Sequence, residues 1–290
     1  MDKLLTLTTG RMEMRLHHPC DGFYQGTRFD RSGVFAGLLL DGRQLCAPWF
    51  EAYDPFAHDA VQGPAEEFSP IPGPFPGTLV KIGVGLLDAA QDDYDRFRLY
   101  PIRDAGQWTV HAAPASVTFR HRVEGLYVYT KEIRLTGPAA FDIHHTLEAE
   151  TPLSGEVYNH NFFTMDCLQT GPGRELGFPF RPEGDWRSVY DSVTFTPSGV
   201  RFLRPLAAGE SVYSGNIQEA GAEGMPYAMT VREGPLAVRI SGSVPVRRTV
   251  LWANHRIACL EPYNAFSAAP GQAFRWTLSY RLENAEGREK

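Results

Sequence analysis

The sequence lacks any long apolar run. No window of the 290 residues holds about 18 consecutive apolar residues, the length that a membrane-spanning helix needs. Residues 1–7 also lack the apolar core of about 7 to 15 residues that a secretory signal peptide carries. We therefore expect a cytoplasmic protein without a membrane partner.

Basic residues are outnumbered by acidic ones. The chain has 28 Lys and Arg against 34 Asp and Glu, which gives a formal net charge of −6. Proteins that bind nucleic acids present a basic face or stripe, and the pair Arg247–Arg248 is too short to form one. The sequence therefore predicts no nucleic-acid partner.

Cysteine is scarce, and no two cysteines form a CxxC pair. This spacing matches neither a zinc site nor a redox motif, so we expect buried free thiols. His144 and His145 are neighbours in a predicted strand, where their side chains point to opposite faces and cannot share one metal ion. The sequence predicts no metal site. The cysteines are Cys20, Cys46, Cys167 and Cys259.

Alternation of apolar and polar residues with period two is the clearest local pattern. In residues 274–281, Phe, Trp, Leu and Tyr share one face, and Arg, Thr and Ser share the other. Turn sequences rich in Gly and Pro separate such runs, as expected between strands. The same pattern recurs in residues 116–121, 127–135, 141–150, 192–195 and 237–240.

This pattern favours an all-β protein. Strands that recur about every 8–12 residues are typical of sandwiches, and only residues 88–94 favour a short helix. We expect one large antiparallel β-sandwich domain over residues 1–290, with few short helices. Residues 48–77 hold seven prolines, and we predict that they form an ordered loop over one end of the sandwich.

Two residues stand out as candidates for acid–base chemistry. His160 is flanked by Asn and aromatic residues at a predicted strand end, and an imidazole with an ordinary pKa near 6.5 suits proton transfer at neutral pH. Glu261 lies between an apolar strand and Pro262, where partial desolvation would suit a general base. Each residue alone is also compatible with a purely structural role.

Three blocks together resemble the aldose 1-epimerases, also called galactose mutarotase-like proteins. Residues 255–282, HRIACLEPYNAFSAAPGQAFRWTLSYRL, are similar to the family's C-terminal signature, an acidic residue before Pro, a PG turn and an amphipathic last strand. Residues 156–163, EVYNHNFF, lie about 100 residues upstream, where the family carries a His motif. Residues 22–50, GFYQGTRFDRSGVFAGLLLDGRQLCAPWF, resemble its first hairpin. The resemblance implies a galactose mutarotase-like β-sandwich.

The resemblance also implies roles for single residues. His160 would be the general acid that protonates the ring oxygen of a hexose or hexose derivative. Glu261 would be the general base that takes the proton of the anomeric hydroxyl. Ring opening and reclosure would then exchange the α and β anomers, with neither a metal ion nor an organic cofactor.

Further residues are expected to bind the sugar. The family's second His and its Asn-Arg pair are missing from the first third of this chain, and we consider His58, Arg28 and Lys81 as replacements. Glu67 is unusual for an enzyme of neutral sugars and is also expected in the pocket. The residues expected to orient or contact the sugar from the His block are Tyr158, Asn159 and Asp166.

Two alternatives stay open at this point. The same fold could carry another carbohydrate reaction, that of a lyase or a glycoside hydrolase, or it could bind a sugar without turnover. The sequence identifies neither the sugar nor the oligomeric state, and a homodimer stays open.

Overall fold

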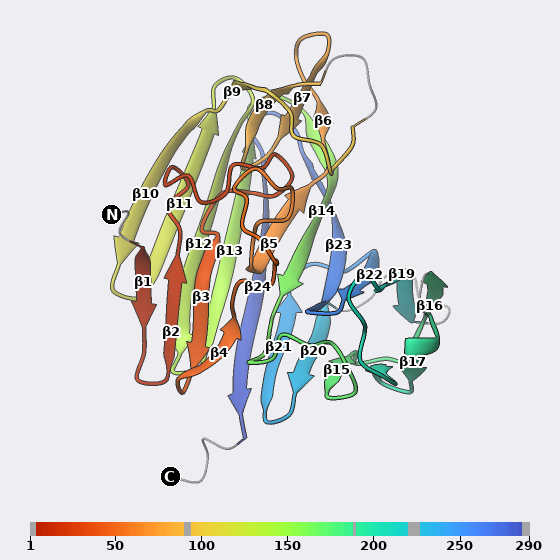
Figure 1. The fold of residues 1–290 in the computed structure, drawn as a ribbon. Helices are drawn as coiled ribbons and strands as arrows, with labels where there is room; N and C mark the ends of the chain where they lie inside the picture. Colours follow the sequence, from red (N-terminus) through yellow and green to blue (C-terminus); the bar gives the residue numbers. More distant parts are fainter. Residues whose placement is uncertain (1–3, 90–93, 188–189, 220–226, 286–290) are drawn as a thin grey trace.

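The computed structural model describes residues 4–89, 94–187, 190–219 and 227–285, and these residues form mostly strands (Figure 1). Neighbouring strands pair antiparallel in every sheet. The single helical element of the described residues is a 3-10 turn, η1 (Tyr190–Ser192). The prediction of an all-β antiparallel fold is confirmed.

A ten-stranded sheet forms one layer of the sandwich. Its long central strands alternate between buried and more exposed side chains because one face covers the core and the other faces outward. In spatial order the sheet consists of β10 (Gln107–Ala113), β11 (Ser116–Val123), β12 (Tyr127–Gly137), β13 (Ala140–Ala149), β24 (Ala273–Asn284), β21 (Leu236–Gly242), β20 (Ala228–Glu233), β15 (Arg174–Gly177), β18 (Gly199–Phe202) and β17 (Val193–Thr196).

A six-stranded sheet carries the candidate site. Phe68 at the end of β5 packs edge-to-face on Tyr129 and Trp276 of the ten-stranded sheet, which joins the two layers through the core. In spatial order the six strands are β16 (Pro182–Arg187), β19 (Ser211–Glu219), β22 (Arg248–Asn254), β23 (Ala258–Ala268), β14 (Leu153–Phe162) and β5 (Gly63–Phe68).

Two four-stranded sheets complete the fold. In Figure 1 the N-terminal sheet lies in front of β10–β13, and Phe35 contacts Phe141 across the shared core. The N-terminal sheet consists of β1 (Leu5–Thr8), β2 (Met12–Leu16), β3 (Phe35–Leu40) and β4 (Arg43–Cys46). The other consists of β6 (Ile71–Pro72), β7 (Thr78–Lys81), β8 (Gly85–Asp88) and β9 (Ile102–Asp104).

The strands predicted from alternation are present within a few residues of their expected ends. The last predicted strand is β24, and Trp276, Leu278 and Tyr280 face the core as the pattern indicates. His145 is buried and stacks on Trp276, whereas His144 contacts Thr277 from a more exposed position. The two adjacent histidines therefore do point to opposite faces.

The interpretation of residues 48–77 as one loop is wrong. This interval contains β5 and β6, and β5 is the edge strand of the six-stranded sheet. All six residues of β5 are buried, so the strand shows no apolar–polar alternation in the sequence. Pro64 is tolerated because an edge strand has one side that needs no ladder hydrogen bond.

Three smaller expectations have mixed outcomes. Cys46 and Cys259 are buried free thiols as predicted, but Cys20 is exposed and Cys167 is partly exposed. The short helix expected at residues 88–94 falls largely on residues 90–93, which lie outside the described residues. In the part of the chain that the structure describes, no helix has the length and apolarity needed to span a membrane.

Because His121 is buried, we expect the protein to lose stability in acid. His121 is buried against Trp108, with ring centroids 4.2 Å apart, and its Nε2 lies 2.8 Å from the carbonyl oxygen of Ala105. Burial lowers the pKa of His121 from its ordinary value of 6.5 to about 4. Between these values the unfolded chain binds the extra proton, so the free energy of unfolding falls as the pH drops through this window. The difference corresponds to ~3 kcal/mol.

Urea denaturation between pH 7 and pH 4 would measure this effect. We expect His121→Gln to remove part of the pH dependence, while His111→Gln, at an exposed position of the adjacent strand, leaves the dependence unchanged. Equal pH dependence in the parent protein and in His121→Gln would contradict the assignment.

Candidate active site

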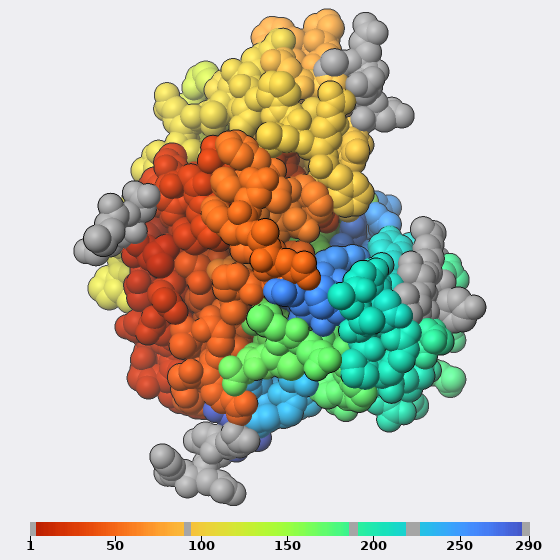
Figure 2. Space-filling view, viewed as in Figure 1, coloured from red at the N-terminus to blue at the C-terminus, as the bar shows by residue number. Residues whose placement is uncertain are grey.

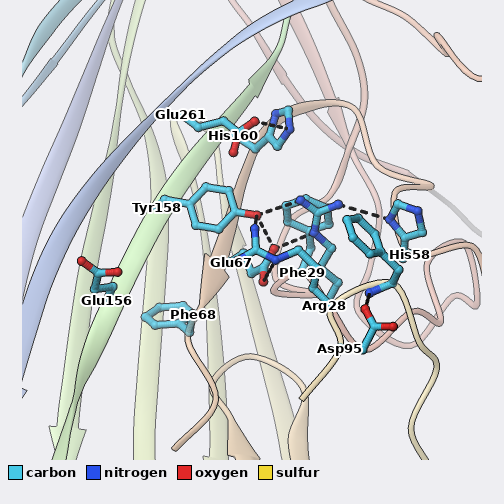
Figure 3. A network of polar contacts seen from close by, with 12 residues as sticks. Arg28, Phe29, His58, Glu67, Phe68, Asp95, Glu156, Tyr158, His160 and Glu261 are labelled. Carbon is cyan, nitrogen blue, oxygen red and sulfur yellow. Dashed lines mark hydrogen bonds and ion pairs between the residues drawn. The ribbon is translucent and has the colours of Figure 1, made fainter. Parts of the chain in front are cut away.

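His160 and Glu261 face each other on two neighbouring strands. The antiparallel register of β14 and β23 pairs Tyr158 with Tyr263, so two residues further along His160 lies opposite Glu261. The distance from His160 Nε2 to Glu261 Oε1 is 3.2 Å, and the exposed fractions of the two residues are 2% and 4%. The structure thus brings together the two residues that the sequence singled out for acid–base chemistry (Figure 3).

The surroundings of His160 keep its imidazole neutral. The ring stacks on Phe162 with centroids 3.7 Å apart, and Phe29 and Trp252 meet it edge-on. Burial lowers the pKa of His160, and the nearby carboxylate of Glu261 opposes this only in part. A carboxylate only accepts hydrogen bonds, so the single proton of the neutral ring is on Nε2. Nδ1 is buried and has no hydrogen-bond partner among the described residues.

A cavity of about 170 Å³ opens over this pair. On the face shown in Figure 2, the orange segment after β4, the yellow segment before β9 and the blue and teal strands of the C-terminal half meet around it. Its aromatic walls are Trp49, Phe97, Phe162, Tyr213 and Trp252. Its polar and charged lining residues are Arg28, His58, Asp59, Arg96, His160 and Glu261.

Arg28 lies at the centre of a second group of polar contacts (Figure 3). Its Nε donates to Glu67 Oε2 at 2.6 Å and its Nη2 donates to the Tyr158 hydroxyl at 2.8 Å. Its Nη1 lies 3.2 Å from Nδ1 of His58. A guanidinium only donates, so Nδ1 of His58 accepts and the proton of the neutral His58 ring is on Nε2. His58, which is partly exposed, therefore offers an N–H donor beside the cavity.

Charges shift the ionisation of the groups behind the cavity. Burial alone would raise the pKa of Glu67, but the charges of Lys81, Arg28 and Arg96 outweigh it and hold that pKa below its ordinary value. Lys81 is fully buried, and its Nζ donates to the carbonyl oxygen of Phe68 at 2.5 Å. Burial lowers the pKa of Lys81 to about 8, opposed by Glu67. Burial also lowers the pKa of His58, so this ring is neutral at pH 7.

Strand alternation separates Glu67 from Glu66. Glu67 contacts Arg28 and Tyr158 behind the cavity, while Glu66 points into the interior, where it lies 3.2 Å from Nε2 of His145. Asn159 follows the same rule on β14, so its side chain donates to Glu66 at 3.1 Å on the face away from His160.

The predicted sugar-binding residues therefore separate into three groups. Arg28 and His58 line the cavity, and Glu67, Tyr158 and Lys81 support them from behind. Asn159 lies between the sheets and does not line the cavity. Asp166 lies in the loop after β14, where it is 41% exposed and forms an ion pair with Arg43 at 3.1 Å.

Arg96 is the main residue that the sequence analysis missed. It lies in the segment between β8 and β9, and its Nη1 donates to the Tyr158 hydroxyl at 3.2 Å. Its Nε lies 3.7 Å from Glu67 Oε1. No motif distinguishes Arg96 from Arg98 in the stretch DRFRL, so only the path of this segment over the cavity reveals its role.

Comparison with known proteins supports the fold. No protein-family model matches the sequence, and no curated protein matches it either. Among solved structures, a galactose mutarotase related enzyme from Lactobacillus acidophilus aligns with a TM-score of 0.58 at 9% identity, over 98% of each chain. A galactose mutarotase-like protein from Lactobacillus casei gives 0.56 at 12% identity, over 97% of this chain and 100% of its own. A GalM/aldose epimerase homologue from C. elegans aligns with a TM-score of 0.56 at 15% identity, over 98% of this chain and 99% of its own.

The chain thus has the galactose mutarotase-like fold, a β-sandwich that it shares over nearly its whole length with aldose epimerase homologues. The fold implied by the sequence resemblance is confirmed. At such low identity the likeness establishes the fold alone, and the chemistry has to be argued from the site.

Proposed function

We propose that the protein is an isomerase of the aldose 1-epimerase type, which exchanges the α and β anomers of an aldose. The observation that carries this proposal is His160 held 3.2 Å from the Glu261 carboxylate at a cavity with aromatic walls. The cavity, about 170 Å³, is below the range of about 300–1,000 Å³ for drug-sized ligands and suits a single sugar ring.

The reaction needs two proton transfers and no change of oxidation state. Before the step, His160 takes up a proton from solvent and becomes an imidazolium. Glu261 then accepts the proton of the anomeric hydroxyl, the bond between C1 and the ring oxygen breaks, and His160 gives its Nε2 proton to that oxygen and becomes neutral. The product is the open-chain aldehyde. After rotation about the C1–C2 bond, the two proton transfers run in reverse, and the ring closes with the other configuration at C1. Two positioned groups of this kind contribute roughly 10²- to 10⁴-fold each.

The aromatic walls and the polar network have separate tasks in this proposal. Trp49, Phe162 and Trp252 exclude water and offer apolar faces to the C–H groups of the sugar. Arg28 is held rigidly by Glu67 and Tyr158, and it fixes His58 so that the Nε2–H of His58 can donate to a sugar hydroxyl.

Glycoside hydrolysis receives less support from the same geometry. It would need a second carboxyl group that gives a proton to the leaving group, besides Glu261. Glu67 is unsuited to that task because its neighbouring cations hold its pKa low. The cytoplasmic location and the lack of a nucleic-acid partner stay predictions of the sequence.

Polarimetry of anomer exchange tests the proposal. Pure α anomers of several aldoses, including aldoses with a carboxylate or a phosphate, are followed with and without the protein, and we expect faster exchange for at least one. Nitrophenyl glycosides in parallel samples would report hydrolysis. A folded protein that accelerates no exchange would overturn the proposal, and release of nitrophenol would replace it by the hydrolase alternative.

A further inference from the structure

Positive charge is in excess behind the candidate site. Three cationic side chains share the single carboxylate of Glu67, with Arg28 at 2.6 Å, Arg96 at 3.7 Å and Lys81 at 3.8 Å. Glu67 and Lys81 are 2% and 0% exposed, so water screens these charges little.

The other acidic groups near the cavity face different partners. Glu261 is in contact with His160 at the other end of the cavity. Asp59 is partly exposed, and its carboxylate lies 3.9 Å from Nε2 of His58. The charge of Asp95 acts on His58, and Oδ1 of Asp95 accepts a hydrogen bond from the backbone N–H of Phe97 at 2.9 Å. Around Glu67 itself, the described residues leave two positive charges without a matching carboxylate.

An excess of buried charge is unfavourable without a partner of opposite sign. The low pKa of Lys81 is one consequence, because burial and the two neighbouring guanidinium groups all disfavour its ammonium form. An anion bound in the cavity would reduce this imbalance, and the site is therefore electrostatically complementary to a negatively charged ligand.

Arg96 is the cation placed to meet such a ligand. Its side chain is 38% exposed and lines the cavity, whereas that of Arg28 is 8% exposed. Arg28 uses Nε, Nη1 and Nη2 for Glu67, His58 and Tyr158. Arg96 contacts Tyr158, Tyr263 and, at a longer distance, Glu67, but it has five N–H groups and therefore retains donors for a carboxylate or a phosphate.

Arg96 contacts β14 at a point that also suits the size of one sugar ring. Arg96 donates to Tyr158, and the rings of Tyr158 and His160 are neighbours on the same face of β14, with centroids 6.3 Å apart. With C1 and the ring oxygen at Glu261 and His160, the exocyclic C6 group, which is two bonds from the ring oxygen, can extend toward Arg96.

We propose that the substrate is an aldose with an anionic substituent, a carboxylate or a phosphate, and that Arg96 binds this group. The inference rests on the proposed function and specifies its substrate class. A uronic acid and a hexose 6-phosphate present the same chemistry to Arg96, and the experiment distinguishes them.

The test compares matched neutral and anionic sugars. Anomer exchange is measured for glucose, glucuronate and glucose 6-phosphate, and binding of the same three sugars is measured by saturation-transfer NMR and titration calorimetry. We expect kcat/KM for one anionic sugar to exceed that for glucose, and this preference to decline as the salt concentration rises. The anionic sugar with the larger increase in kcat/KM over glucose identifies the substituent as carboxylate or phosphate.

Two variants distinguish a direct contact between Arg96 and the anionic group from a general effect of positive charge. Arg96→Gln is expected to lower kcat/KM for the anionic sugar by roughly 10- to 100-fold, as for the loss of a charge-assisted hydrogen bond, and to lower that for glucose by a smaller factor. Arg98→Gln removes the same charge two residues away, at an exposed position where the guanidinium lies over Tyr100, and is expected to leave both rates unchanged.

The outcomes distinguish this inference from the proposed function. Equal rates for neutral and anionic sugars, or equal losses for both in Arg96→Gln, would overturn the inference and leave the epimerase proposal standing. Binding of an anionic sugar that weakens in Arg96→Gln, without exchange of any sugar, would support the inference and overturn the epimerase proposal. Neither binding nor exchange would overturn both.

Discussion

Glu261→Gln is expected to lower the rate of anomer exchange by roughly 10²- to 10⁴-fold, the usual contribution of one general acid or base. The amide has nearly the shape of the carboxylate but cannot accept a proton from the anomeric hydroxyl. It can still accept a hydrogen bond from Nε2 of His160, so the fold of β23 should be preserved.

His160→Ala is expected to have an effect of the same order, and the double variant little more than either single one. Residues that act as one unit lose their joint contribution when either is removed. Glu156→Gln is the matched control, because it removes a carboxylate from β14, the strand of His160, outside the cavity lining, where Glu156 is paired with Arg248. Near-parental exchange rates in Glu261→Gln would exclude Glu261 as the base.

Lys131→Met is expected to lower the free energy of unfolding by about 3–5 kcal/mol. Lys131 is 1% exposed and lies between two carboxylates, in contact with Glu66 and 3.3 Å from Asp30. Burial alone would lower the pKa of Lys131, but these two carboxylates outweigh it and raise that pKa. Without the ammonium group, two buried carboxylates face each other with no cation between them.

Urea denaturation would measure this loss at pH 7. Arg134→Met is the matched control on the same strand, because Arg134 is 53% exposed and its ion pair with Glu132 should contribute at most about 1 kcal/mol. Adding Glu66→Gln to Lys131→Met should recover part of the stability, since one of the unmatched charges is then absent. A change below about 1 kcal/mol in Lys131→Met would contradict the prediction.

The buried cluster also connects the core to the candidate site. The backbone N–H of Asp30 donates to the carbonyl oxygen of Glu66 at 2.9 Å. Arg28 precedes Asp30 by two residues and Glu67 follows Glu66, so this hydrogen bond helps to place Arg28 beside Glu67. Strain or movement at Lys131 should therefore reach Arg28 through both segments. For this reason the activity of Lys131→Met is informative only together with its stability.

Much of the fold follows from local patterns in the sequence. A strand exposes one face and buries the other, so alternation in β12, β13 and β24 can be read residue by residue. Alternation did not predict β5 because both faces of this strand are covered, and because Pro64 and two glutamates are typical of loops. The same period of two, applied to β14, would have placed Asn159 on the opposite face from Tyr158 and His160.

By itself the sequence determined the strands with clear alternation, the sandwich class and the choice of His160 and Glu261, because these depend on backbone periodicity and on short blocks with a family resemblance. The tertiary structure decided which groups those residues contact. The register of β14 and β23 places the imidazole against the carboxylate, and the segment before β9 brings Arg96 to Tyr158. Such contacts join residues far apart in the chain, so they depend on sheet register and loop path, which no local pattern encodes.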